Sequence, residues 1–323
     1  MYAIRQYEFG APTALRYERM PDPAPGDGQI RVDVRAAGVH LIDTMIRRGA
    51  TGGPFALPAL PMTPGREVAG AVDAVGAGVE PDWLGRRVVV HLGQASGGYA
   101  EFALAPADRL HTIPDGMPAE MAVAMIGTGR TAVGVLHRAA LTADDVVIVT
   151  AAAGGLGSLF VQEATALGAT VVALAGNARK VAQARSLGAG IAVDYQDPDW
   201  AAAVRAALGD RTATVAFDGV GGPVGRAVFE LLGSGGRLAR FGWSSGAPAH
   251  IDAEEFVARG VTDVPLRIPQ RPDGLRRLES VALDKAARGA WQVRTEAFGL
   301  ARASAAHEAL EGRATTGKVV LVR

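Results

Sequence analysis

The sequence contains no cysteine among its 323 residues. This absence excludes disulfide bonds, thiolate nucleophiles, iron–sulfur clusters and every zinc site that needs a cysteine ligand. A net charge is missing too, because 33 basic side chains balance 33 acidic ones. Nothing in the charge pattern therefore points to nucleic acid or to an anionic membrane surface, and we expect the partner to be a small molecule.

Long apolar runs are also absent. Val146 to Gln162, an uncharged run as long as any in the chain, contains several glycines and falls short of the roughly 18 apolar residues that a membrane span needs. Arg5 and Glu8 interrupt the N-terminal segment, so the sequence predicts no signal peptide. We therefore expect a cytoplasmic protein that does not enter a membrane.

The length predicts about two domains, at roughly 150 residues each. From Val146 onward, short β-branched runs alternate with helical stretches, which is typical of βαβ units and of a parallel sheet covered on both faces. Strands are expected at 146–149, 171–174, 191–193, 214–217 and 237–241. This half of the chain is predicted to be a doubly wound α/β domain of the Rossmann type.

The first part of the chain has a different pattern. Apolar and polar residues alternate over 30–36, as in a strand with one solvated face, and proline and glycine crowd the connections. Further strands are expected at 67–75, 87–91, 99–105 and 317–322. The pattern predicts an irregular antiparallel β domain, to which the last strand returns.

The two patterns together predict a division of the chain. We expect a substrate-binding β domain from residues 1–121 and 256–323, and a cofactor-binding domain from residues 122–255.

The strand over 146–149 leads into a glycine-rich loop, and an apolar helix follows. A dinucleotide-binding loop needs a close turn, then a residue without a side chain near the pyrophosphate, then a small residue where the helix packs on the strand. Ala152, Gly154 and Gly157 have this spacing, with alanine in place of the usual first glycine. An ordinary glycine-rich turn is the alternative, but the order of strand, loop and helix within repeated βα units favours a dinucleotide whose phosphates bind at the helix N-terminus.

The end of the second strand of this half indicates which nicotinamide cofactor binds. An NAD site usually has an acidic residue there for the ribose hydroxyls. This sequence has Gly176 instead, followed by Asn177, Arg179 and Lys180. Cations in the first turn of a helix oppose its dipole, so they indicate an anionic ligand, the 2′-phosphate of NADPH. The alternative is that Asn177 only caps the helix and that the two cations are solvated.

Seven segments occur in the order of a known family: 36–44, 64–70, 97–102, 151–157, 217–221, 241–242 and 313–318. With them the chain resembles, over nearly its whole length, the zinc-independent medium-chain dehydrogenases/reductases, and within these the quinone oxidoreductases of the zeta-crystallin type. The resemblance implies a GroES-like β domain for the substrate, a Rossmann domain for NADPH, a nicotinamide in the cleft between them, and a homodimer.

Zinc-dependent relatives of this family carry cysteine where this chain has His40 and histidine where it has Arg66. The remaining candidate ligands are His40, Glu67, His91 and His111, and Arg66 next to Glu67 opposes a dication. We therefore predict that the protein binds no metal. The short-chain dehydrogenases are excluded, because no tyrosine of this sequence is followed by a lysine four residues later.

The resemblance also implies cofactor contacts, position by position. They are Ile42, Thr44 and Met45 beside the nicotinamide; Gly154, Gly155, Leu156 and Gly157 under the pyrophosphate; Gly176, Asn177, Arg179 and Lys180 at the adenosine phosphate; Tyr195 at the adenine; Phe241, Gly242, Trp243 and Ser244 near the nicotinamide ribose; Val264 and Leu266 at the carboxamide; and Arg313 closing the site.

Two departures from the family's pattern bear on the chemistry. His40 stands where close relatives tend to have asparagine, and Met45 where many have tyrosine. Without a hydroxyl at position 45, His40, Tyr99 or water is left to protonate the product, and we predict His40, Asp43 and Tyr99 as catalytic residues. The alternatives are that His40 is a loop histidine bonded to backbone carbonyls and that Asp43 caps the helix that follows.

The predicted function is that of an NADPH-dependent reductase, which transfers hydride directly to quinones or to other electron-poor alkenes such as enones. Such acceptors need positioning and hydrogen-bond donors for the developing oxyanion, and not necessarily a metal. Two other functions stay open. One is reduction of enoyl thioesters, for which Arg47, Arg48 or the segment 267–277 would bind a coenzyme phosphate. The other is an NADPH-binding sensor without turnover.

Overall fold

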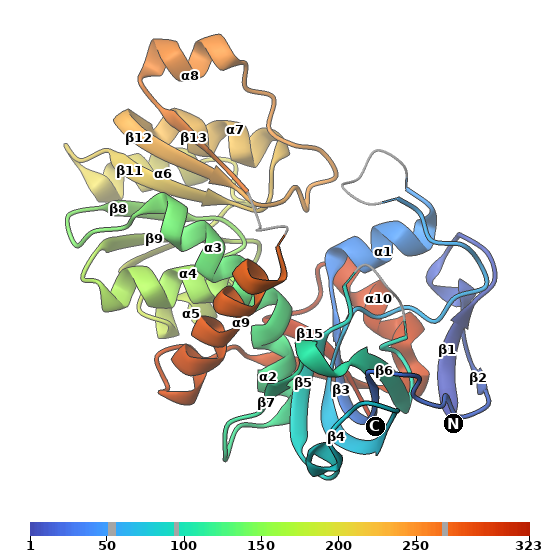
Figure 1. The fold of residues 1–323 in the computed structure, drawn as a ribbon. Helices are drawn as coiled ribbons and strands as arrows, with labels where there is room; N and C mark the ends of the chain where they lie inside the picture. Colours follow the sequence, from blue (N-terminus) through green and yellow to red (C-terminus); the bar gives the residue numbers. More distant parts are fainter. Residues whose placement is uncertain (51–55, 94–96, 267–270) are drawn as a thin grey trace. The chain divides into compact units, whose positions relative to one another are not determined.

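The computed structural model describes residues 1–50, 56–93, 97–266 and 271–323. The chain forms two compact units, each with its own sheet (Figure 1). Unit 1 consists of Met1–Gly127, Ala282–Ala287 and Val293–Arg323, and unit 2 of Thr128–Val281 and Arg288–Gln292. In the described part of the chain, no helix combines the length and the apolar character that a bilayer crossing requires.

Unit 2 contains a six-stranded sheet in which every pairing is parallel. The strands lie in the order β10 (Ile191–Asp194), β9 (Thr170–Ala175), β8 (Val146–Val149), β11 (Ala213–Asp218), β12 (Leu232–Arg240) and β13 (Thr262–Pro265). Counted along the chain, this order is 3-2-1-4-5-6, which is that of the doubly wound dinucleotide-binding fold. The predicted Rossmann-type domain is therefore confirmed.

Helices cover both faces of this sheet. Its helices are α3 (Arg130–Ala139), α4 (Gly155–Ala166), α5 (Ala178–Ser186), α6 (Trp200–Leu208), α7 (Gly222–Leu231), α8 (Ala253–Arg259) and most of α9 (Pro272–Ala287). Ile148 and Ala216 face a core shared with α6 and α7. Phe217, the next residue of β11, points the other way and stacks on Phe160 of α4, with the ring centroids 4.4 Å apart. Near-continuous apolar strands are the result of burial on two faces.

Unit 1 is built on a seven-stranded, mainly antiparallel sheet. The strands lie in the order β14 (Thr295–Gly299), β15 (Lys318–Val322), β3 (Gln29–Val39), β4 (Glu67–Val75), β5 (Arg87–His91) and β7 (His111–Thr112), and β6 (Phe102–Pro106) also pairs with β3. A separate hairpin joins β1 (Tyr2–Gln6) and β2 (Leu15–Arg19), and the helices are α1 (Leu41–Arg48), α2 (Ala119–Ala124) and α10 (Ala303–Glu311). As predicted, the last strand returns to this sheet, where Val319 lies opposite Val39.

The structure differs from the predicted division at its second boundary. The sequence places residues from 256 onward in the substrate-binding domain, yet β13 pairs with β12, and Val264 lies opposite Ala239. Residues up to Val281 belong to unit 2. The alternation of strands and helices is hard to recognise after Phe241, because α8 has seven residues and β13 only four.

Candidate active site

Helix α1 begins directly after β3 and carries several of the predicted site residues. His40 is its N-cap residue, and its backbone N–H donates a hydrogen bond of 2.8 Å to Oδ2 of Asp43. Asp43 therefore does cap the helix, as the alternative held. Its other oxygen, Oδ1, accepts a hydrogen bond of 2.9 Å from Nε of Arg66, so the same carboxylate also belongs to a buried ion pair.

The imidazole of His40 belongs to a cluster of charged side chains. Its Nε2 atom lies 2.8 Å from Oε1 of Glu67 and 2.9 Å from Nζ of Lys318, and the last two atoms are 2.7 Å apart. Glu67 begins β4, Lys318 begins β15, and both strands pair with β3, after which His40 follows. The sheet register thus brings the three residues together. Nε2 contacts charged side chains and not the backbone carbonyls of the alternative reading.

The carboxylate of Glu67 is enclosed on two sides by glycines. A Cβ atom at Gly38 would lie 1.8 Å from Oε1, and one at Gly127 would lie 1.9 Å from Oε2. Burial raises the pKa of Glu67, but the nearby cationic groups, His40 when protonated and Lys318, outweigh this effect and hold the pKa well below its usual range. Glu67 is therefore an ionised carboxylate in a completely buried place.

A second group of polar side chains, Tyr99 and His307, lies next to Asp43. The hydroxyl of Tyr99 lies 3.3 Å from Oδ2 of Asp43 and 3.3 Å from Nε2 of His307. Tyr99 is completely buried, and burial raises its pKa well above the usual value. Burial also lowers the pKa of His307 to about 4, so that imidazole is neutral. These contacts make Tyr99 a residue that positions Asp43, because its hydroxyl does not reach the surface.

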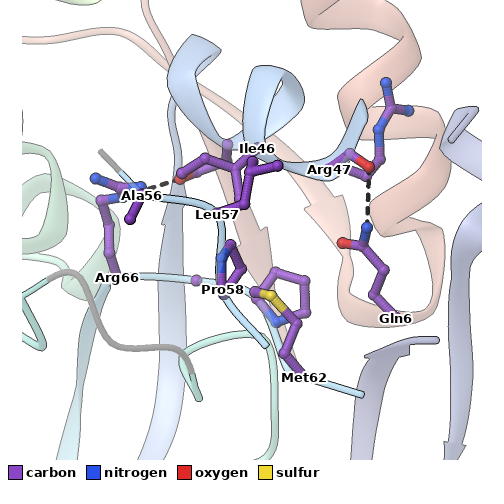
Figure 2. A pocket seen from close by; sticks show the side chains of 11 residues that line it. Gln6, Ile46, Arg47, Ala56, Leu57, Pro58, Met62 and Arg66 are labelled. Carbon is purple, nitrogen blue, oxygen red and sulfur yellow. Dashed lines mark hydrogen bonds and ion pairs between the residues drawn. The ribbon is translucent and has the colours of Figure 1, made fainter. Parts of the chain in front are cut away.

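A cavity of about 260 Å³ lies beside Asp43 and Arg66 in unit 1 (Figure 2). Its apolar lining comes from Ile46, Leu57, Pro58 and Met62. Gln6 contributes a polar group: its Nε2 donates to the carbonyl of Arg47 at 2.9 Å, and its buried Oε1 has no hydrogen-bond partner among the described residues. The cavity can hold a small, largely apolar group that brings one hydrogen-bond donor.

The glycine loop of unit 2 connects β8 to α4. A Cβ atom at Gly157 would lie 2.3 Å from the carbonyl oxygen of Ala151, so only glycine lets the helix approach the loop this closely. Gly154 is the N-cap residue and offers no side chain to the N–H groups of the first turn. These N–H groups and the positive end of the helix dipole suit the phosphates of a dinucleotide, and the first turn of the helix contains Gly155, Leu156 and Gly157.

Asn177 follows β9, and the sequence allows it to be a cap of the next helix or a contact for a phosphate. Its Oδ1 accepts a hydrogen bond of 3.0 Å from the backbone N–H of Lys180, so Asn177 does cap α5. The bond uses only the amide oxygen and leaves the NH₂ group for an anion. Arg179 and Lys180 lie in the first turn of α5. Tyr195 lies next to this corner, because a Cβ atom at Gly176 would be 2.9 Å from its hydroxyl.

A buried carboxylate that the sequence analysis did not single out organises the loops at the ends of β8, β11 and β12. Asp218 accepts hydrogen bonds from Oγ1 of Thr150 at 2.9 Å and from the backbone N–H groups of Val220 and Gly221 at 3.0 and 3.2 Å. Its own carbonyl accepts a bond of 2.9 Å from the N–H of Phe241. The signal for it is the motif Phe217 to Gly221, in which an acidic residue ends an apolar strand before two glycines.

These loops contain the next group of predicted cofactor contacts. Phe241, Gly242, Trp243 and Ser244 follow β12, and the N–H of Ser244 donates to the carbonyl of Gly219 at 2.9 Å. Val264 is buried within β13, and the more exposed Leu266 follows that strand. The carboxyl ends of β8 and β11 are also where the strand order of the sheet changes direction, which is the usual ligand site of such folds.

The predicted cofactor contacts of unit 1 differ in exposure. Thr44 is completely buried, and its Oγ1 donates to the carbonyl of Leu41 at 2.8 Å. Ile42 and Met45 are only partly buried, so both can contact a ligand. Arg313 follows α10 and has a positive φ of 55°.

The donor set around His40 does not suit a zinc ion. The ammonium of Lys318 lies against both His40 and Glu67, and Arg66 is paired with Asp43. His91 accepts a hydrogen bond of 2.9 Å at Nδ1 from the N–H of Gly93. Within the described ranges, no three side chains of the ligand types gather closely enough to hold a metal.

Two family models match the chain. One, described as an alcohol dehydrogenase GroES-like domain, matches residues 26–115, and the other, described as a zinc-binding dehydrogenase, matches residues 155–271. The GroES-like fold predicted for the first part of the chain is thereby confirmed.

Full-length relatives point the same way. The chain is 30% identical to the quinone oxidoreductase of Pseudomonas aeruginosa over 320 residues, which are 97% of each protein. It is 30% identical to the 2-haloacrylate reductase of a Burkholderia species, over 98% of this chain and 97% of the relative. The crystal structure of the Escherichia coli quinone oxidoreductase complexed with NADPH is 29% identical and has a TM-score of 0.89 over the whole of both chains. A mycobacterial protein complexed with NADPH is 33% identical, with a TM-score of 0.88 over the whole of both chains.

Proposed function

Because the chain belongs to the quinone oxidoreductase family of the medium-chain dehydrogenases/reductases, we propose that it reduces quinones and other electron-poor alkenes with NADPH, by direct hydride transfer. The observation that carries the proposal is the full-length likeness to a quinone oxidoreductase whose structure holds NADPH. The similar 2-haloacrylate reductase takes an activated alkene, which supports the wider acceptor class.

The chain's own residues fit NADPH at two places. The glycine loop and the first turn of α4, from Gly154 to Gly157, would hold the pyrophosphate. The amide of Asn177 and the cations Arg179 and Lys180 would hold the 2′-phosphate, for which charge-assisted hydrogen bonds are the strongest contacts available. NADPH, when bound, supplies a hydride from C4 of its nicotinamide and becomes NADP⁺.

We assign to His40 the orientation of the acceptor's carbonyl oxygen. Its Nε2 faces Glu67 and Lys318, and its side chain is also paired with the backbone N–H of Asp43 in the capping box of α1, so binding of the substrate would replace that last contact. A fixed donor at this oxygen stabilises the negative charge that develops there as hydride arrives. Asp43 and Tyr99 act on His40 indirectly, since Asp43 fixes its backbone N–H and Tyr99 fixes Asp43.

The reaction, in this proposal, needs no metal. A dication at His40 and Glu67 would have to displace Lys318, whose ammonium already lies 2.7 Å from the carboxylate. Hydrogen bonds and cationic side chains of the protein would stabilise the negative charge that develops on the oxygen of the acceptor.

The enoyl thioester alternative receives less support. Arg47 is 1% exposed and its Nη2 is bound to Oε1 of Glu311 at 2.6 Å, so it is not available to a coenzyme phosphate. Arg48 is more exposed, but its Nε also lies 3.5 Å from Glu311. Residues 267–270 of the segment named for this role lie outside the described residues.

The test is the rate of NADPH oxidation with matched quinones, enones and enoyl thioesters, together with NADPH binding measured without an acceptor. We expect binding, and turnover with quinones and enones. Tight binding without turnover on any acceptor would favour the sensor instead, and a preference for enoyl thioesters would favour the second enzyme. The family resemblance also leads us to propose a homodimer, which the mass of the protein in solution tests.

A further inference from the structure

Lys318 is a buried cation with a fixed place. Its side chain is 4% exposed, and its Nζ lies 2.7 Å from Oε1 of Glu67 and 2.9 Å from Nε2 of His40. The backbone at this position is anchored as well, because the N–H of Lys318 donates to the carbonyl of Arg294 at 2.8 Å. An ammonium taken out of water needs an anion close by, and Glu67 is that anion.

Glu67 depends on Lys318 in the same way. The carboxylate lies close to the backbone of Gly38 and Gly127, where a side chain at either position would overlap it. Its cationic neighbours are the ammonium of Lys318 and, when protonated, the imidazoles of His40 and His91. Glu67 does not require a charged His40 as long as Lys318 carries a positive charge.

The charges of the cluster balance without His40. Asp43 is paired with Arg66 at 2.9 Å, and Glu67 with Lys318 at 2.7 Å. A proton on His40 would add a third cation to two carboxylates, with Nε2 only 2.9 Å from the ammonium. The ammonium at this distance opposes a proton on His40 and the carboxylate of Glu67 at 2.8 Å favours one, so the charge of His40 depends on the presence of Lys318.

We infer that Lys318 is a positioning residue that keeps the imidazole of His40 uncharged, by supplying the cation that the buried carboxylate of Glu67 requires. A neutral imidazole of His40 then orients the oxygen of the acceptor. The proton of the product comes from water. The inference rests on the proposed function only for this last consequence, since the charge state of His40 is a property of the free protein.

Other charged groups surround His40. They are Glu67 at the start of β4, Arg66 just before that strand, Asp43 of α1, Lys318 of β15, and His91 of β5, which lies opposite Glu67 in the sheet. The test therefore compares variants that change one of these charges and leave the others in place.

The experiment is a histidine NMR titration of the free protein, with His40 assigned from the signal lost in His40→Gln. In the wild-type protein we expect His40 to show the nitrogen shifts of a neutral imidazole at neutral pH. In Lys318→Met the imidazole of His40 is the cationic group that contacts the carboxylate of Glu67 directly, so the midpoint of the His40 titration should rise by about 1–3 pH units. Lys318→Arg keeps the cation and should titrate like the wild type. Lys318→Met combined with Glu67→Gln removes both charges and should reverse the rise.

Three results would overturn the inference: a charged His40 in the wild-type protein at neutral pH, an unchanged midpoint in Lys318→Met, or an equal rise in the double variant. The first needs no variant, so the inference stays testable if Lys318→Met does not fold. In turnover, Lys318→Met should acquire a pH dependence across the neutral range that the wild type and Lys318→Arg lack. A protein that shows the NMR behaviour but reduces no quinone would refute the proposed function and leave the role of Lys318 intact.

Discussion

Removing Lys318 should destabilise unit 1 strongly, because it leaves a buried carboxylate without the ammonium that is paired with it. Glu67 is 0% exposed and Lys318 is 4% exposed, with 2.7 Å between Oε1 and Nζ. Loss of one partner from such a pair costs about 3–5 kcal/mol, whereas removal of both charges costs less. Lys318→Met has nearly the volume of lysine, so the loss reports the charge and not a cavity. The assay is urea unfolding of Lys318→Met and of its combination with Glu67→Gln.

The comparison with an exposed pair provides the control. Arg35 and Asp33 lie in the same sheet, with Nη2 2.7 Å from Oδ2, but the side chain of Arg35 is 60% exposed. Arg35→Met should therefore cost about 0–1 kcal/mol. The loss in Lys318→Met should reach this size at a pH above the raised midpoint of His40, and it should shrink as the pH falls through that midpoint, because a proton on His40 then places a cation beside Glu67 again. If the double variant is no more stable than Lys318→Met, the carboxylate is not what makes the loss large, and the reasoning is wrong.

Three further predictions concern the cofactor, the acceptor and metals. Lys180→Ala should weaken NADPH by about one to two decades and leave NADH nearly unchanged, because a charge-assisted bond to phosphate is worth roughly 1.5–3 kcal/mol; equal loss for both cofactors in a binding titration would refute the assignment. His40→Ala should slow enones and quinones alike, by roughly 10²–10³, because both acceptors lose the group that orients the oxygen on which negative charge develops; full activity on both classes with normal folding would leave His40 without a catalytic role. A chelator should not change turnover, and stoichiometric zinc with chelator-sensitive activity would contradict this.

Much of the fold was accessible from the periodicity of the sequence. The strands Glu67–Val75 and Arg87–His91 have the predicted ends, because apolar runs are bounded there by charges and turns. β12 begins at Leu232, five residues before the predicted start, since Gly233, Gly235 and Gly236 suggest a turn although they continue the strand. The strand predicted from Tyr99 begins only at Phe102. In both cases tertiary pairing overrides the local preference.

The cofactor loop was predictable for a related reason, since its chemistry is local. Gly154 and Gly157 act within one strand, loop and helix, and their spacing carries the information. The surroundings of His40 were not predictable in this way. Glu67 and Lys318 are separated by most of the chain, and only the pairing of β4 and β15 with β3 brings them together. The one local signal for Lys318 is a charge at the head of an otherwise apolar strand, Lys318–Val322.

The most direct test of the account is the fate of the hydrogen at C4 of the nicotinamide. The protein would be given an enone and NADPH that carries deuterium in the transferred position, and the product would be analysed by NMR. We predict deuterium bound to the β-carbon of the saturated ketone and a solvent proton at the α-carbon. A product whose new carbon-bound hydrogens both come from solvent would contradict direct hydride transfer.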